Sequence, residues 1–164
     1  MALVLSDRPG VAALDRATAA GVPALVVDRG AHRPDRDALT LAVVHALCEH
    51  ELELVAMAGF MTILEQAIFD AFPGRVVNTH PSLLPAFRGA SAVRDALAAG
   101  VKVTGCTIHL ATREVDSGPI LAQEAVPVLD DDDEVSLHER VKAVERTLYP
   151  RVLQALVADL ERRS

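Results

Sequence analysis

The sequence predicts an α/β fold, and two observations support this prediction. Short runs rich in valine, leucine and isoleucine recur along the 164 residues, which is typical of buried strands. All but the last two runs are separated by alanine-rich or helically spaced segments, often closed by glycine or proline. Strands that alternate with helices favour a mostly parallel sheet with helices on both faces.

The first half of the chain is expected to hold three strands and three helices. The strands are residues 3–5, 24–27 and 52–58. The helices are residues 11–20, a segment after the charged loop 28–37, and residues 64 or 65 to 72. The second of these helices has an apolar face made of Leu39, Val43, Ala46 and Leu47.

The second half continues the alternation and ends in a long helix. Strands are expected at residues 76–80, 102–110 and 120–128, and helices at residues 90–99 and about 133–162. Gly105 inside a strand indicates that another group approaches closely. Pro150 should kink the last helix. The apolar stripe of that helix is Leu137, Val141, Val144, Leu148 and Val152.

The composition is that of one globular domain, residues 1–164, without a nucleic-acid surface. Hydrophobic residues make up 51% of the chain and charged residues 24%, which is sufficient for a single core. The net charge of −7 disfavours binding to a phosphate backbone, which requires clustered lysine and arginine. One tyrosine, four phenylalanines and no tryptophan offer few surfaces for base stacking.

The cysteines and most histidines are expected to be structural or solvated. Cys48 and Cys106 lack metal-ligand spacing and fit reduced thiols, and no acidic or thiol cluster accompanies His45 or His50. The chain shows no secretory leader and no run of 18 apolar residues. We therefore expect a cytoplasmic protein with no metal and no membrane contact. The five acids at 130–134 are interpreted as a solvated turn that favours the amino end of the last helix.

The segment from residue 76 to residue 89 breaks the aliphatic pattern with polar chemistry. Asn78 and His80 are two residues apart on a strand, so their side chains should project from the same side. Pro81 stops strand pairing where they emerge, at the edge where open α/β sheets bind ligands. An amide and an imidazole held together can stabilise an oxygen that becomes negative during acyl transfer. The structural alternative is a strand end with satisfied polar side chains.

The segment Asn-Thr-His-Pro-Ser-Leu-Leu-Pro at 78–85 resembles the signature of the folate-dependent formyltransferases. Segments 57–64, 105–110 and 115–120 are similar to the phosphoribosylglycinamide (glycinamide ribonucleotide) formyltransferase branch, and the resemblance spans nearly all 164 residues. It implies a Rossmann-like formyltransferase fold and formyl transfer from 10-formyltetrahydrofolate to the amine of glycinamide ribonucleotide in purine biosynthesis. The implied partners are these small molecules, and a homodimer is left open.

The resemblance also assigns roles to residues of this sequence. It places Asp116 beside His80, where a carboxylate orients the ring and supports proton transfer, so the expected catalytic residues are Asn78, His80 and Asp116. The residues expected to bind folate are Met61, Thr62, Ile63, Leu64, Thr112, Val115 and Asp116. The residues expected near the ribonucleotide are Gly59, His109, Lys142 and Glu145. Met61, Ile63 and Leu64 are equally compatible with core positions, and Lys142 and Glu145 with exposed helix charges.

The sequence departs from the family in several places. Family members begin with a strand, a glycine-rich phosphate loop and a helix before the segment that matches Leu3, and we expect weak ribonucleotide binding and reduced sheet pairing without them. The family often carries arginine or lysine where Thr62 stands. Arg88 and Gly89 are closer to methionyl-tRNA formyltransferase. That enzyme, formyltetrahydrofolate hydrolase and a non-catalytic folate-binding module are the alternatives.

Overall fold

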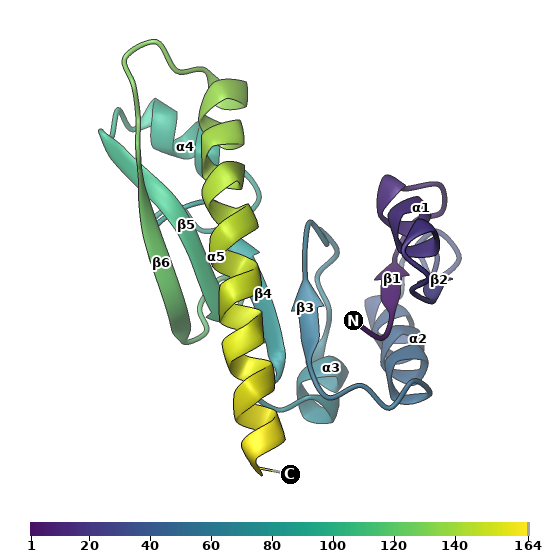
Figure 1. Cartoon of the computed structure of the whole chain (residues 1–164). Helices are drawn as coiled ribbons and strands as arrows, with labels where there is room; N and C mark the ends of the chain where they lie inside the picture. Colours follow the sequence, from purple (N-terminus) through teal and green to yellow (C-terminus); the bar gives the residue numbers. More distant parts are fainter. Residues whose placement is uncertain (164) are drawn as a thin grey trace. The chain divides into compact units, whose positions relative to one another are not determined.

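The computed structural model describes residues 1–163, which form alternating strands and helices (Figure 1). The strands are β1 Val4–Ser6, β2 Ala24–Val26, β3 Val55–Met57, β4 Val76–His80, β5 Val103–Leu110 and β6 Ile120–Pro127. The helices are α1 Ala12–Ala19, α2 Arg36–Cys48, α3 Gln66–Ala71, α4 Ala92–Ala98 and α5 Glu134–Arg163. Every predicted element is present with ends shifted by a few residues, so the α/β class is confirmed. Among these residues, no helix has the length and apolar character needed to cross a membrane.

The chain divides into two compact units, which are described separately. The first comprises Met1–Val55 and Gly59–Arg75, and the second comprises Ala56–Ala58 and the chain from Val76 onward. The prediction of a single domain stays a prediction.

The first unit is built on a parallel pair of strands and three helices. β1 pairs with β2 so that Val4 lies opposite Ala24. Asp35 caps α2, because its carboxylate accepts a hydrogen bond of 2.9 Å from the Ala38 amide. The predicted apolar face of α2 is buried at Leu39, Val43 and Leu47, and α2 packs against α3.

The second unit carries the four-stranded sheet, in the order β3-β4-β5-β6. β4 and β5 are antiparallel, and so are β5 and β6. The predicted parallel pairing therefore holds for β1 and β2 but not for the last three strands. The connections from β4 to β5 and from β5 to β6 return the chain to the sheet at the same end of the strands. Parallel neighbours require a crossover to the opposite end.

The long helix α5 covers β5 and β6 of this sheet (Figure 1). Its predicted stripe is fully buried at Leu137 and Val141 and is 1% exposed at Leu148, whereas Val144 and Val152 are half-buried. The helix continues through Pro150, and the kink expected at this residue stays a prediction.

The acidic run lies in the turn before α5, as predicted, and Asp133 also caps the helix, which the sequence did not predict. Asp133 accepts a 2.8 Å hydrogen bond from the Ser136 amide, and the Asp133 amide donates a 3.0 Å bond back to the Ser136 hydroxyl. Asp132 forms two short bonds with Arg140, of 2.6 and 2.8 Å, and this guanidinium holds the pKa of Asp132 well below its usual range. The carboxylates of Asp132 and Asp133 are therefore paired within the turn and the first turns of α5.

Tyr149 ties α5 to the strands β3 and β4. Its hydroxyl lies 2.9 Å from the carbonyl oxygen of Val77 and 3.0 Å from that of Met57, and burial together with the Glu145 carboxylate raises the pKa of Tyr149, which keeps the hydroxyl a donor. Tyr149→Phe removes this donor without changing the ring. We expect the free energy of unfolding to fall by about 1–3 kcal/mol in a urea titration. An unchanged unfolding midpoint contradicts this role.

Candidate active site

The polar end of β4 places Asn78 and His80 on the same side of the sheet. The strand begins with the buried residues Val76 and Val77. It pairs with β5 so that Asn78 lies opposite His109 and His80 lies opposite Thr107. Paired residues of antiparallel strands project to the same face. An amide and two imidazoles are therefore gathered on one face at the carboxyl end of β4.

His80 is held between a carboxylate and a backbone carbonyl. Its Nδ1 lies 3.4 Å from Asp116 Oδ2, and its Nε2 lies 2.8 Å from the carbonyl oxygen of Phe87. Because a carbonyl only accepts, Nε2 carries a proton and donates it to Phe87. The nitrogen that faces Asp116 is thus the one that can gain or release a proton. His80 is 4% exposed and Asp116 is 9% exposed, so their interaction is sheltered from water.

His109 orients the amide of Asn78. Its Nδ1 lies 3.0 Å from the Leu110 carbonyl oxygen and must donate to it, while burial lowers the pKa of His109 and keeps the ring neutral near pH 7. Nε2 is then an acceptor for Asn78 Nδ2, 3.5 Å away. Asp116 Oδ1 lies 3.7 Å from the same nitrogen. In this arrangement the second proton of the Asn78 amide is available to another acceptor.

The loop after His80 is anchored on β5. Thr107, fully buried, donates a 2.6 Å hydrogen bond to the Ser82 carbonyl and accepts one of 3.0 Å from the Leu84 amide. Gly105 makes room for this loop, because a methyl group there would collide with the Leu83 side chain and with the Glu124 carbonyl. The close approach predicted for Gly105 is therefore confirmed.

Gln123 on β6 completes the anchor of this loop. Its Nε2 donates hydrogen bonds of 2.9 Å to the Leu84 carbonyl and to the Thr107 hydroxyl. Gln123→Leu takes this donor away from the Leu84 carbonyl and removes one of the two hydrogen bonds that the Thr107 hydroxyl accepts. We therefore expect the free energy of unfolding to fall by about 1–3 kcal/mol, and kcat to fall because the Phe87 carbonyl that holds His80 is less well fixed. Thermal unfolding and steady-state kinetics measure these effects. Gln154→Leu, the same change on the exposed side of α5, is the control, and an equal effect there contradicts the role of Gln123.

The link between β5 and β6 presents Asp116 to the histidines. Asp116 adopts a left-handed backbone conformation with φ of 53°, and its Oδ2 accepts a 2.8 Å bond from the Gly89 amide. Gly118 must lack a side chain, because a methyl group there would overlap the Leu110 carbonyl. In the same link, Val115 is exposed, and Thr112 bonds the Glu114 carbonyl at 3.0 Å.

The folate-binding residues expected in the first unit differ in exposure. Met61 is 65% exposed and Ile63 is 45% exposed, whereas Leu64 is a core residue at 6%. Thr62 donates a short hydrogen bond to the buried carboxylate of Asp7. Gly59 adopts φ of 64°, which favours glycine at this turn.

The two charged candidates on α5 have different environments. Lys142 pairs with Glu139 at 2.9 Å on the surface of the helix. Glu145 is half-buried and accepts a 3.1 Å hydrogen bond from the Thr79 hydroxyl. Glu145 is therefore fixed against the sheet, while Lys142 has the character of a surface charge.

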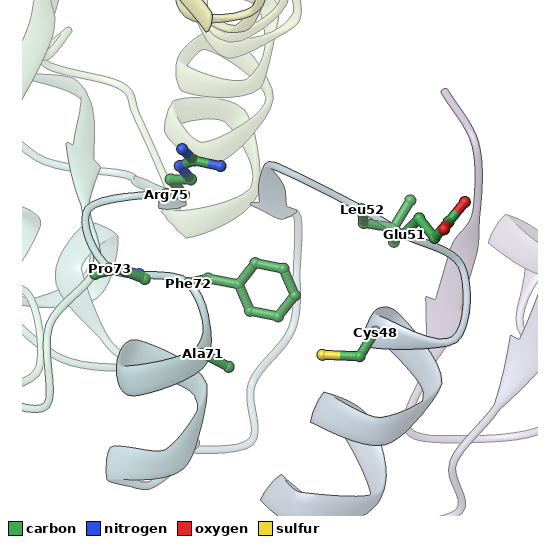
Figure 2. A pocket seen from close by; sticks show the side chains of 7 residues that line it. All are labelled: Cys48, Glu51, Leu52, Ala71, Phe72, Pro73 and Arg75. Carbon is green, nitrogen blue, oxygen red and sulfur yellow. The ribbon is translucent and has the colours of Figure 1, made fainter. Parts of the chain in front are cut away.

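The cysteines and the two histidines near α2 are the other residues that the sequence analysis considered. Cys48 and Cys106 are both free, and His45 and His50 are exposed. Within residues 1–163, no group of three or more His, Cys, Asp or Glu side chains is arranged to hold a metal ion. A surface hollow of about 480 Å³ lies in the first unit, where Cys48 and the Phe72 ring face each other (Figure 2). None of the predicted site residues lines it.

The chain is similar to known proteins in sequence and in structure. A profile of the formyl transferase family matches residues 1–153. The chain is 53% identical over 144 residues to phosphoribosylglycinamide formyltransferase of Mycobacterium tuberculosis, which covers 88% of this chain and 66% of the relative. It is 36% identical to the enzyme of the same name from Bacillus subtilis, over 95% of this chain and 80% of that one.

A solved structure gives the same relationship. Glycinamide ribonucleotide transformylase 1 from Symbiobacterium toebii superposes with a TM-score of 0.90 at 46% identity, covering 93% of this chain and 71% of that chain. The chain thus spans somewhat less than two thirds of the mycobacterial relative and more of the others.

These matches show that the chain belongs to the formyl transferase family. Within the family, its relatives in sequence and in structure include the phosphoribosylglycinamide formyltransferases, so the resemblance inferred from the sequence is confirmed, and so is the Rossmann-like fold class.

Proposed function

We propose that the chain transfers a formyl group from 10-formyltetrahydrofolate to the amine of glycinamide ribonucleotide. The observation that carries this proposal is the cluster of Asn78, His80 and Asp116 in a family whose relatives are named for this reaction. The reaction requires an oxyanion donor and a proton acceptor near the formyl carbon. The cluster offers one group for each task.

In the proposed mechanism, the amine attacks the formyl carbon and the formyl oxygen becomes negative. One proton of the Asn78 amide is bound to His109, and Asn78 donates the other proton to the formyl oxygen. Since Nε2 of His80 is bound to the Phe87 carbonyl, the nitrogen of His80 that faces the reaction is Nδ1, on the side of Asp116. His80 therefore takes part through Nδ1, together with Asp116.

The proton balance gives Asp116 and His80 their task. The new bond joins the amine nitrogen to the formyl carbon, and the bond between that carbon and N10 of the folate breaks. The amine nitrogen loses one proton and N10 gains one, so no covalent intermediate on the protein is needed. We assign this proton transfer to the His80 and Asp116 pair, whose carboxylate stabilises the charged imidazole.

The substrate-binding residues are assigned through the family resemblance. Met61 and Ile63 expose apolar side chains that suit an aromatic folate ring, and Val115 does so on the second unit. Glu145 and His109 suit the polar ribonucleotide. Leu64 is a core residue, so it supports the folate site through packing. Lys142 is a surface charge available to a phosphate. The reaction belongs to purine biosynthesis, and we place it in the cytoplasm.

A transfer assay with defined acceptors tests this proposal. The purified chain is incubated with 10-formyltetrahydrofolate and increasing glycinamide ribonucleotide, and both products are quantified. We expect equal amounts of formylated ribonucleotide and tetrahydrofolate. Formate release without an acceptor would indicate a hydrolase, formylation of methionyl-tRNA the tRNA enzyme, and folate binding without turnover a binding module. Each of these three results contradicts the proposal.

A further inference from the structure

The middle residue of the Asn-Thr-His segment faces away from its neighbours. Asn78 and His80 project to one side of β4, so Thr79 projects to the other. On that side the Thr79 hydroxyl lies 3.1 Å from Glu145 Oε2 on α5 and 3.5 Å from the Cys106 sulfur on β5. The strand β4 therefore carries two proposed catalytic residues on one face, and on the other face it contacts a carboxylate of α5.

The direction of these hydrogen bonds follows from the groups involved. Glu145 as a carboxylate only accepts, so Thr79 donates its single hydroxyl proton to Glu145. Burial raises the pKa of the Cys106 thiol to about 11, against the opposing effect of the Thr79 hydrogen bond, so the thiol remains protonated at neutral pH. The thiol can then donate to Thr79. With the thiol donating to the hydroxyl and the hydroxyl donating to the carboxylate, the O–H bond of Thr79 points toward Glu145.

The backbone of α5 is also fixed at this point. Tyr149 follows Glu145 by one helical turn, and its hydroxyl is bonded to the strand carbonyls of Val77 and Met57. Glu145 is therefore restrained both through its side chain and through the helix that carries it. A restrained carboxylate loses less conformational entropy when it accepts a hydrogen bond from a ligand.

We propose that Thr79 is a positioning residue, which holds the Glu145 carboxylate ready to accept hydrogen bonds from hydroxyl or amine groups of the acceptor substrate. This inference rests on the proposed function, because it takes the acceptor to be a ribonucleotide. It makes β4 serve both substrates: Asn78 and His80 act on the formyl group, and Thr79 acts on the acceptor through Glu145.

Thr79→Val tests this proposal, because valine keeps the shape of threonine but cannot donate. We expect the KM for glycinamide ribonucleotide to rise about tenfold, with kcat and the KM for the folate within about twofold of wild type. Thr79→Ser should restore most of the loss. In a Glu145→Gln background, Thr79→Val should add little, since the two residues act as one unit. Thr147→Val, which removes a hydroxyl bonded only to its own helix, is the control.

The possible outcomes separate the two proposals. If wild type shows no transfer, the proposed function fails, and calorimetry with the ribonucleotide still compares the binding of wild type and Thr79→Val. If Thr79→Val does not fold, Glu145→Gln must itself raise the KM or Kd for the ribonucleotide. An unchanged KM and Kd, or an equal loss toward folate and ribonucleotide, overturns the positioning role.

Discussion

Asn78→Ala is expected to lower kcat by roughly 10²–10³-fold, because it removes the donor to the developing oxyanion. The amide of Asn78 is oriented by neutral His109, which accepts one of its protons at 3.5 Å and leaves the other for the substrate. This contribution arises in the transition state, so the KM values should change little. Steady-state kinetics with both substrates measures the effect.

The Asn78→Ala protein must be shown to remain folded. Asn78 is half-buried and its side chain is not part of the apolar core, so thermal unfolding and folate binding should stay close to wild type. Asn78→Gln keeps the amide but displaces it by one methylene group, and it should also be impaired because placement decides the donor's effect. Wild-type turnover by the alanine variant contradicts the oxyanion role.

Asp116→Asn is expected to lower kcat by roughly 10²–10⁴-fold, the range associated with general acid and base groups. Asparagine tolerates the left-handed backbone of residue 116 and can still accept the hydrogen bond from Gly89. It lacks the negative charge that lies 3.4 Å from His80 Nδ1. The substitution thus removes the charge and retains the shape of the link.

Glu114→Gln is the matched control for this change, since it neutralises an exposed acid two residues away whose carboxylate lies 3.9 Å from the Arg88 guanidinium. Its kcat should equal that of wild type. An equal loss in both variants would mean that net charge in the link, and not the contact with His80, determines the rate.

The sequence was most informative where periodicity and side-chain chemistry coincide. The two-residue spacing of Asn78 and His80 predicted a shared face, and the strand register agrees with it. The apolar stripe of α5 followed from helical periodicity in the same way, whereas the cap at Asp133 was not predicted. The position of Asp116 beside His80 came from the family resemblance alone, because 36 residues of chain (116 − 80) separate them.

The contacts that the sequence did not predict are made by backbone groups or by distant partners. The Phe87 carbonyl and the Gly89 amide, which fix His80 and Asp116, carry no signal in residue type. The alternation of strands and helices likewise did not reveal that β4, β5 and β6 are antiparallel. Thr79 had a readable signal, since a polar residue pointing away from Asn78 and His80 requires its own partner.

The double variant His80→Ala with Asp116→Asn tests most directly whether the carboxylate acts through the imidazole in formyl transfer. The structure predicts that the double variant is no slower than His80→Ala alone, because Asp116 loses its catalytic effect once the ring is absent. The kcat for formylated ribonucleotide is the quantity to compare. Losses that simply multiply in the double variant, or turnover close to wild type, would contradict the account.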